Sequence, residues 1–175
     1  FRLGDAVVPP CRPENLGDPA FRAAYGLRYA YVGGSMANGI ASLKMAAALA
    51  QEGMLGFFGA AGLSPSQVEE TIDEAGGFLC GFNLIHSPNE PRLEDALADL
   101  YLRREVRLIE ASAYLDLTPA LVRYRAKGLR RLPDGRVEAV NRVMAKVSRI
   151  EVATRFFSPA PEGLLRELAA AGRIT

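Results

Sequence analysis

The sequence has little of several residue types on which common functional sites depend. Its 175 residues include no tryptophan, two cysteines and a single histidine, His86. One imidazole excludes a histidine-rich metal site, and it leaves a Ser-His-Asp triad possible only through His86. Cys11 and Cys80 form neither a CxxC pair nor a metal-type cluster. We therefore expect two unpaired thiols in a reduced protein and no bound metal.

Strong charge and long apolar runs are also missing. The formal net charge of +1 argues against a nucleic-acid-binding surface and indicates no attraction to anionic membranes. No run of about 20 apolar residues is present, so we expect no membrane span. The opening residues FRLGDAVVPP lack the layout of a signal peptide and an initiator methionine, as in a trimmed or incomplete product. These features predict a cytoplasmic protein without nucleic-acid or membrane partners.

Hydrophobic residues make up 49% of the chain, enough for one domain with a core. From Tyr25 onward, apolar runs that end in small residues alternate with segments typical of helices. Strands are expected at 27–34, 54–62, 78–86, 106–112 and 143–148. Helices are expected at 36–52, 64–75, 92–104, 118–127, 150–157 and 161–171. The dipeptide Asp134-Gly135 predicts a small β-hairpin between the fourth helix and the fifth strand.

This alternation predicts an α/β fold with a parallel sheet and helical crossovers. Two architectures fit five such units: a complete, doubly wound flavodoxin-like sheet, or about five-eighths of a (β/α)₈ barrel, the TIM barrel. Residues 1–20, with four prolines and little periodicity, are expected to form an irregular N-terminal extension. Residues 21–175 then form the domain.

In either architecture, ligands bind where parallel strands end. The first such segment runs from Gly33 and Gly34 through Ser35 to Met36. Glycines let a backbone approach a flat ring closely, and amides at a helix start can donate to it. The segment is equally compatible with a tight turn that binds nothing. Its spacing is neither a GxGxxG fingerprint nor a Walker A loop.

Two polar residues interrupt later apolar strands. Asn83 needs hydrogen-bond partners, which a ligand or the neighbouring backbone could supply. Lys146 needs a counter-charge, such as Glu110 or an anionic ligand, unless its ammonium reaches the barrel mouth. His86 could serve in acid–base chemistry or brace a loop. The basic run from Arg123 to Arg131 fits a solvated face or a docking patch for an acidic partner.

Five segments carry a resemblance to a known family. They are YGLRYAYVGGSMANGIAS, MLGFFGAAGLSP, GFNLIHSPNEP, VRLIEASAYLDLTPALVRYR and VMAKVSR. They resemble the PfaD-type enoyl reductases, which are trans-acting flavoproteins of polyunsaturated-fatty-acid synthases and trans-acyltransferase polyketide synthases. That family belongs to the nitronate monooxygenase (2-nitropropane dioxygenase) superfamily. The resemblance extends over about residues 21–175.

The resemblance implies a (β/α)₈ barrel that binds FMN non-covalently. It implies reduction of an enoyl thioester on an acyl carrier protein, with NADPH as hydride donor. It also implies the following cofactor-binding residues: Gly33, Gly34, Ser35, Met36, Asn83 and Lys146.

The same resemblance implies that part of the machinery lies outside these residues. The superfamily's active-site histidine and flavin-phosphate loops belong to later strands, beyond Thr175, so no catalytic residue is assigned here. The chain is then expected to be a fragment of the oxidoreductase, inactive alone and dependent on the C-terminal half of the barrel. Two alternatives stay open: a nitronate monooxygenase-like flavin oxidase, and a non-catalytic docking module.

Overall fold

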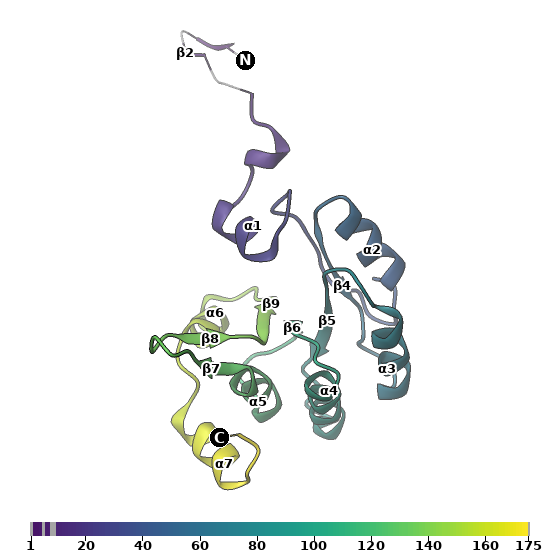
Figure 1. Cartoon of the computed structure of the whole chain (residues 1–175), viewed down its shortest axis with the longest axis vertical. Helices are drawn as coiled ribbons and strands as arrows, with labels where there is room; N and C mark the ends of the chain where they lie inside the picture. Colours follow the sequence, from purple (N-terminus) through teal and green to yellow (C-terminus); the bar gives the residue numbers. More distant parts are fainter. Residues whose placement is uncertain (1, 5, 8–9, 175) are drawn as a thin grey trace.

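A parallel sheet of five strands forms the centre of the molecule. The computed structural model describes residues 2–4, 6–7 and 10–174, and Figure 1 shows their arrangement. The central strands are β3 (Val32–Gly33), β4 (Leu55–Phe58), β5 (Cys80–Ile85), β6 (Leu108–Ser112) and β9 (Arg142–Ala145). They lie side by side in chain order, and every neighbouring pair is parallel.

Strand order decides between the two architectures. A flavodoxin-like sheet has the order 2-1-3-4-5, whereas the strands of a (β/α)₈ barrel follow chain order. The observed order β3-β4-β5-β6-β9 therefore identifies the chain as part of a (β/α)₈ barrel. The prediction of five strand–helix units in an incomplete barrel is confirmed.

Helices connect the strands and cover the sheet. They are α1 (Pro19–Tyr25), α2 (Leu43–Gln51), α3 (Pro65–Glu74), α4 (Pro91–Arg103), α5 (Pro119–Lys127), α6 (Ile150–Phe157) and α7 (Glu162–Ala170). Ser42, Ser64 and Thr118 precede α2, α3 and α5, and each hydroxyl accepts the amide three residues later. These caps satisfy amides that the first turn leaves free, and they explain where the helices begin. Figure 1 shows α2, α3 and α4 along one side of the sheet.

Alternate strand residues face two different cores. Phe58 and Phe82 point toward the helices, with ring centroids 5.6 Å apart, and they belong to a large cluster with α4 and α5. Leu55, Phe57 and Leu108 point the other way, into the barrel interior. The interior therefore has an apolar layer toward the N-terminal ends of the strands.

Helix α1 closes the N-terminal end of the interior. Its Phe21 and Tyr25 pack against the interior cluster. Two members of that cluster, Leu55 and Leu108, are the first residues of β4 and β6. Arg142, the first residue of β9, donates to the Ala24 carbonyl at 2.7 Å and lies over the Tyr25 ring at 4.9 Å. The C-terminal ends of the strands lie at the opposite end of the interior.

Some predicted boundaries were wrong. The strand expected at 27–34 is the two-residue β3, the strand expected at 143–148 ends at Ala145, and the helix expected at 36–52 begins at Leu43. Asn38 and Gly39 have φ values of 55° and 68°, which an α-helix excludes. Their amides bond to carbonyls that follow β4, at 2.7 and 2.9 Å. Residues 34–42 are therefore a loop tied to the end of β4.

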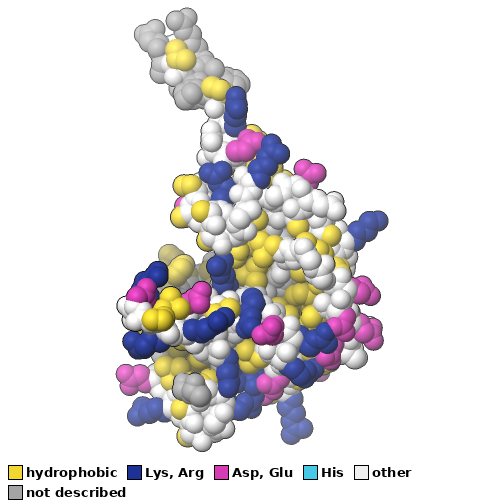
Figure 2. Space-filling model, in the orientation of Figure 1, with side chains coloured by type: hydrophobic (Ala, Val, Ile, Leu, Met, Phe, Trp, Pro, Cys, Tyr) yellow, Lys and Arg dark blue, Asp and Glu magenta, His cyan; other side chains and the backbone are white. Residues whose placement is uncertain are grey.

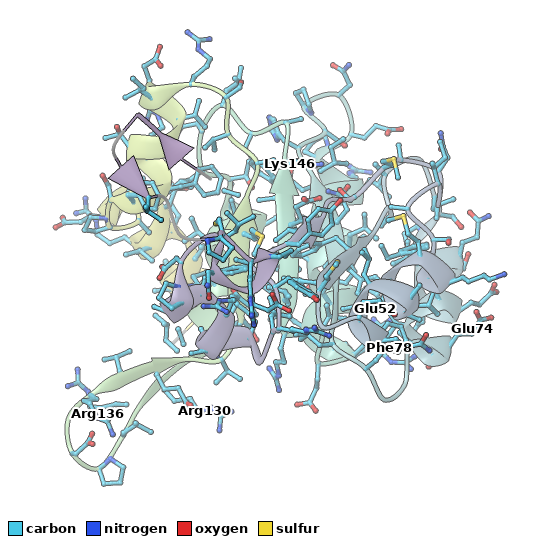
Figure 3. All side chains as sticks on the ribbon, turned by 90° about the horizontal axis from the view of Figure 1, so that it is seen from above. Glu52, Glu74, Phe78, Arg130, Arg136 and Lys146 are labelled. Atoms are coloured by element: carbon cyan, nitrogen blue, oxygen red, sulfur yellow. The ribbon has the colours of Figure 1, made fainter. Side chains whose placement is uncertain are left out.

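The predicted hairpin is confirmed. Strands β7 (Leu129–Arg131) and β8 (Val137–Ala139) pair antiparallel around the Asp134-Gly135 turn. Figure 3 shows its Arg130 and Arg136 well away from Lys146, which follows β9. The hairpin joins α5 to the start of β9, so it lies toward the N-terminal ends of the strands.

The interpretation of residues 123–131 as one solvated basic face was wrong for Arg123. Its side chain is only 3% exposed, and it pairs with Asp95 at 3.0 Å and with Asp99. Both acids lie on α4, so this arginine joins α5 to α4. Figure 2 shows acidic and basic side chains interspersed over the helices on the face it displays.

The N-terminal residues contain short elements of their own. Strands β1 (Arg2–Leu3) and β2 (Ala6–Val7) pair antiparallel, and the 3₁₀ helix η1 covers Pro13–Asn15. Figure 1 shows this pair apart from the body of the molecule. The division of the chain at residue 20 stays a prediction. Within the part of the chain that the structure describes, no helix is long and apolar enough to cross a membrane.

Candidate functional site

A polar layer lies above the apolar interior, at the C-terminal ends of the strands. Its centre is Glu110 on β6, whose side chain is 2% exposed. The carboxylate accepts the Ser35 amide at 2.8 Å and the Ser35 hydroxyl. The Lys146 ammonium lies 3.3 Å away and also donates to the Ser35 carbonyl at 3.1 Å. Lys146 is thus held by a counter-charge, while 48% of its side chain stays exposed. We call this end of the barrel, around Gly34, Ser35, Asn83, Glu110 and Lys146, the mouth.

Asn83 forms the wall beside this pair. Its side-chain nitrogen donates to the Glu110 carbonyl at 3.1 Å and to the Ser112 hydroxyl at 2.7 Å. The Asn83 carbonyl accepts the buried Tyr101 hydroxyl at 2.6 Å. Burial raises the pKa of Tyr101, so this hydroxyl stays protonated and donates. The partners of the Asn83 amide nitrogen are therefore neighbouring residues of the same sheet.

The glycines of the first loop serve different contacts. A Cβ on Gly33 would collide with the Leu49 side chain of α2, so this residue allows helix packing behind the sheet. A Cβ on Gly34 would lie 3.1 Å from the Glu110 carboxylate and 3.7 Å from the Lys146 ammonium. Gly34 therefore faces the polar layer.

The structure brings together four of the six predicted site residues around Glu110: Gly34, Ser35, Asn83 and Lys146. Gly33 faces α2 instead. Met36 is 45% exposed, and its carbonyl lies where a Cβ on Gly59 would fall. Sequence reasoning treated Glu110 only as a possible counter-charge. An acid inside an otherwise apolar strand was the available signal for its central place.

His86 braces a loop, one of the two roles considered for it. Its Nδ1 lies 3.0 Å from the buried Glu94 carboxylate, and its ring stacks on Tyr114 with centroids 5.3 Å apart. Glu94 also accepts the Ser87 amide at 3.4 Å, the Tyr114 hydroxyl at 3.1 Å and the Thr118 hydroxyl. This carboxylate joins α4 to the loops that follow β5 and β6.

Tyr114 stays a donor in this cluster. Burial raises the pKa of its phenol, and the neighbouring Glu94 carboxylate raises the pKa further. Asp116, in the loop after β6, pairs with Arg155 at 3.0 Å and not with Glu110. The two buried glutamates therefore belong to separate clusters, one inside the barrel and one among the helices.

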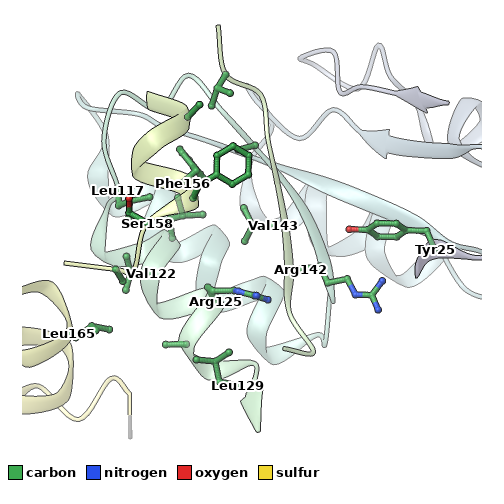
Figure 4. Close-up of a pocket in the computed structure, with 17 residues that line it drawn as sticks. Tyr25, Leu117, Val122, Arg125, Leu129, Arg142, Val143, Phe156, Ser158 and Leu165 are labelled. Carbon is green, nitrogen blue, oxygen red and sulfur yellow. The ribbon is translucent and has the colours of Figure 1, made fainter. Parts of the chain in front are cut away.

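An apolar groove of about 720 Å³ lies on the helix side of β9. Figure 4 shows Val122 and Arg125 of α5, Val143 of β9 and Phe156 of α6 around it. Val143 faces outward, since its neighbours Arg142 and Met144 face the interior with Leu108 and Glu110. Most of the groove therefore lies on the helix side of β9, while Tyr25 and Arg142 bound it at the N-terminal end of the interior.

The chemistry of the mouth fits one side of a flat, electron-rich ligand. Gly34 leaves room for close approach and Lys146 supplies a positive charge, while the Ser35 hydroxyl donates its proton to Glu110. An ammonium stabilises electron-rich oxygen or nitrogen at the edge of a ring, and a side-chain-free backbone allows close approach. Such a donor set suits the ring of a flavin.

Relatives of known description match almost the whole chain. The polyketide biosynthesis protein PksE of Bacillus subtilis (strain 168) is 47% identical over 167 residues, which are 93% of this chain and 22% of PksE. One subunit of the polyunsaturated fatty acid synthase of Thraustochytrium sp. is 45% identical over 97% of this chain and 12% of that protein. The chain thus spans less than a quarter of these curated relatives. No family model matches it.

One solved structure is similar to this chain in both fold and sequence. The enoyl reductase domain of MlnA, from the macrolactin biosynthesis cluster of Bacillus amyloliquefaciens, superposes with a TM-score of 0.86 at 42% identity. The match covers 91% of this chain and 38% of that domain. Enoyl reduction is an oxidation–reduction reaction, so this homology supports an oxidoreductase family. These relatives confirm the resemblance drawn from the five sequence segments.

Proposed function

We propose that this chain, a homologue of the PfaD-type enoyl reductases, forms the flavin-facing part of an enzyme that reduces enoyl thioesters on acyl carrier proteins. The cofactor in this proposal is FMN, and the hydride donor is NADPH. The reaction belongs to polyketide or polyunsaturated fatty acid biosynthesis. The relatives do not favour the nitronate-oxidase or docking-module alternatives. A cytoplasmic location stays a prediction.

One observation carries the proposal. The enoyl reductase domain of MlnA matches 91% of this chain at 42% identity with a TM-score of 0.86. Enzymes with a (β/α)₈ barrel place their active sites at the C-terminal ends of the strands. In this chain, that end carries the polar layer around Glu110, while the other end is closed by α1.

The residues of the mouth have distinct roles in this proposal. A bound flavin supplies hydride transfer to the substrate double bond. Gly34 would allow a flat flavin ring to approach the backbone, and Lys146 would supply a positive charge to it. Asn83 and Ser112 form a polar wall whose mutual hydrogen bond, 2.7 Å long, fixes both side chains. The apolar layer beneath excludes water from the interior side.

The test uses two preparations. One is the 175-residue chain, and the other is the longest protein encoded by the open reading frame that contains this sequence. Each preparation is examined for flavin absorbance, then incubated with NADPH and an enoyl thioester on a carrier protein. We expect flavin in the longer protein, and a carrier product that gains two hydrogen atoms in mass. A flavin-loaded longer protein that leaves the enoyl thioester unreduced would contradict the proposal.

A pair of variants separates the site from general surface charge. Lys146→Met removes the ammonium at the mouth, whereas Arg166→Met removes a positive charge from the exposed face of α7. We expect Lys146→Met to weaken FMN binding about tenfold, which corresponds to about 1.4 kcal/mol. Arg166→Met leaves it unchanged. Equal losses in both variants would argue that net charge, rather than the mouth, attracts the flavin.

A further inference from the structure

The Glu110 carboxylate connects strands that lie at opposite edges of the sheet. Ser35 follows β3, which forms one edge, and Lys146 follows β9, which forms the other. Glu110 lies between them on β6 and accepts the Ser35 amide at 2.8 Å, with the Lys146 ammonium at 3.3 Å. Lys146 and Ser35 also bond directly, ammonium to carbonyl, at 3.1 Å. These three residues form a tie across the inside of the curved sheet.

Stability alone does not account for this tie. Removing a carboxylate from water costs several kcal/mol, and apolar residues of similar volume often replace a buried ion pair without loss. Glu110 lies directly above Leu108 and beside Met144, both interior apolar residues. A third apolar residue at this position would extend the layer below. An apolar residue would serve stability here at least as well, so the carboxylate points to a role in positioning.

That role concerns a loop with little structure of its own. Strand β3 has two residues, and the loop at 34–42 contains two residues with left-handed φ. The bonds of Asn38 and Gly39 tie the loop to the end of β4, next to it in the sheet. The bonds of Ser35 reach β6 and the residue after β9, which are distant in the sheet. The bonds of Ser35 therefore set the position of this loop relative to β9, the strand at the opposite edge of the sheet.

We propose that Glu110 is a positioning residue, which ties the loop after β3 to Lys146 and so fixes the width of the barrel mouth. The tie presents Gly34 and the Lys146 ammonium as one binding surface. Glycine at position 34 suits this arrangement, because a Cβ there would lie 3.1 Å from the Glu110 carboxylate and 3.7 Å from the Lys146 ammonium. This inference rests on the proposed function only in taking the mouth as the ligand surface.

Amide hydrogen exchange of the full chain, read at Ser35 by NMR, tests the tie without any ligand. We expect Glu110→Gln, which keeps an acceptor oxygen but loses the charge that holds Lys146, to accelerate exchange at Ser35 tenfold or more relative to the Gln67 amide, which donates to Ser64 at the start of the distant helix α3. Lys146→Met, at a half-exposed position, accelerates it in the same direction. Lys146→Arg restores slow exchange because the cation is kept.

Two comparisons distinguish a specific tie from general loosening. In the double variant, Glu110→Gln with Lys146→Met, exchange at Ser35 is no faster than in Glu110→Gln alone, since both changes break one connection. Glu94→Gln alters the other buried glutamate and leaves Ser35 exchange unchanged relative to Gln67. Additive effects of the two single variants, or an equal effect of Glu94→Gln, would overturn the inference.

FMN titration of the same variants separates this inference from the proposed function. If the tie is correct and the mouth binds FMN, Glu110→Gln weakens FMN binding at least as much as Lys146→Met. If the wild-type and longer proteins bind no FMN, the proposed function fails, yet Ser35 exchange still decides on the tie. If FMN binds but Ser35 exchange is independent of Glu110, the tie fails and the proposed function stands.

Discussion

Replacing Glu94 with glutamine should destabilise the fold by about 2–3 kcal/mol. The carboxylate accepts four donors: His86, the Ser87 amide, Tyr114 and Thr118. Hydrogen bonds to a charged group contribute about 1.5–3 kcal/mol each, and neutral ones about 0.5–1.5 kcal/mol. Glutamine keeps one oxygen that can still accept the Ser87 amide. Its NH₂ group faces the Tyr114 and Thr118 hydroxyls, which can rotate and accept a hydrogen bond from it.

The loss therefore comes from weaker bonds rather than from unpaired groups. Glu94→Ala should cost more, about 4–5 kcal/mol, because it leaves several buried donors without an acceptor. For a chain of this size, each kcal/mol shifts Tm by about 2–4 °C. We expect Glu94→Gln to lower Tm by about 4–12 °C.

Urea and thermal unfolding, followed by far-UV circular dichroism, measure both variants. The matched control is Glu90→Gln, four residues earlier at the exposed start of α4, where the side chain makes no capping bond. This control should change the unfolding free energy by less than about 0.5 kcal/mol. A Glu94→Gln protein as stable as Glu90→Gln would refute the view that this carboxylate joins α4 to the loops after β5 and β6.

Four further outcomes follow from buried and exposed groups. Tyr101→Phe and Tyr124→Phe should each cost about 1–2 kcal/mol in urea unfolding, because each phenol donates to a buried backbone carbonyl, at 2.6 and 2.7 Å; a cost for only one of them would contradict this. Burial raises the pKa of the Cys80 thiol from 9.0 to about 11, so at pH 8 iodoacetamide should label the exposed Cys11 first, and Cys80 only after unfolding. Because folding keeps Cys80 protonated, its contribution to stability is present below pH 9.0 and is lost as pH rises toward about 11, which urea unfolding at several pH values checks. Phe157→Ala should change the unfolding free energy by less than about 0.5 kcal/mol, since Phe157 is 90% exposed, and a larger loss would show that its ring is packed.

Local signals predicted much of the fold. Ser64 and Thr118, each followed by proline, predicted the starts of α3 and α5, because a cap depends on neighbours three residues away. The Asp134-Gly135 turn predicted the β7–β8 hairpin for the same reason. Helix α6 was predicted with its observed bounds, 150–157. Each of these features is encoded within a few residues.

Non-local contacts explain the parts that were missed. The helix expected from residue 36 begins only at Leu43, because the amides of Asn38 and Gly39 bond to carbonyls after β4 and not within a helical turn. Arg123 looked solvated among other basic residues, yet its partners lie on another helix, 24 and 28 residues earlier. In both cases the deciding partner is distant in sequence.

The candidate site shows the same limit. Asn83 and Lys146 could be singled out because polar residues in apolar strands are unusual. Glu110 was visible by the same signal, but its bond to Ser35 was not, because Ser35 is 75 residues earlier and is held partly through a backbone amide. A backbone donor leaves no trace in residue type. Gly33 and Gly34 look alike in sequence, yet they face opposite sides of the sheet.

The layering of the interior also has an electrical consequence. The Glu110 and Lys146 charges form a dipole whose negative end is buried and whose positive end faces the mouth. The apolar side chains beneath it, including Phe57 and Leu108, form a low-dielectric floor that water does not screen. The field of the pair is therefore directed outward through the mouth, where it favours electron-rich groups. A chain with a net charge of only +1 can thus present a local positive charge at one end of its barrel, and added salt should screen it because 48% of the Lys146 side chain is exposed.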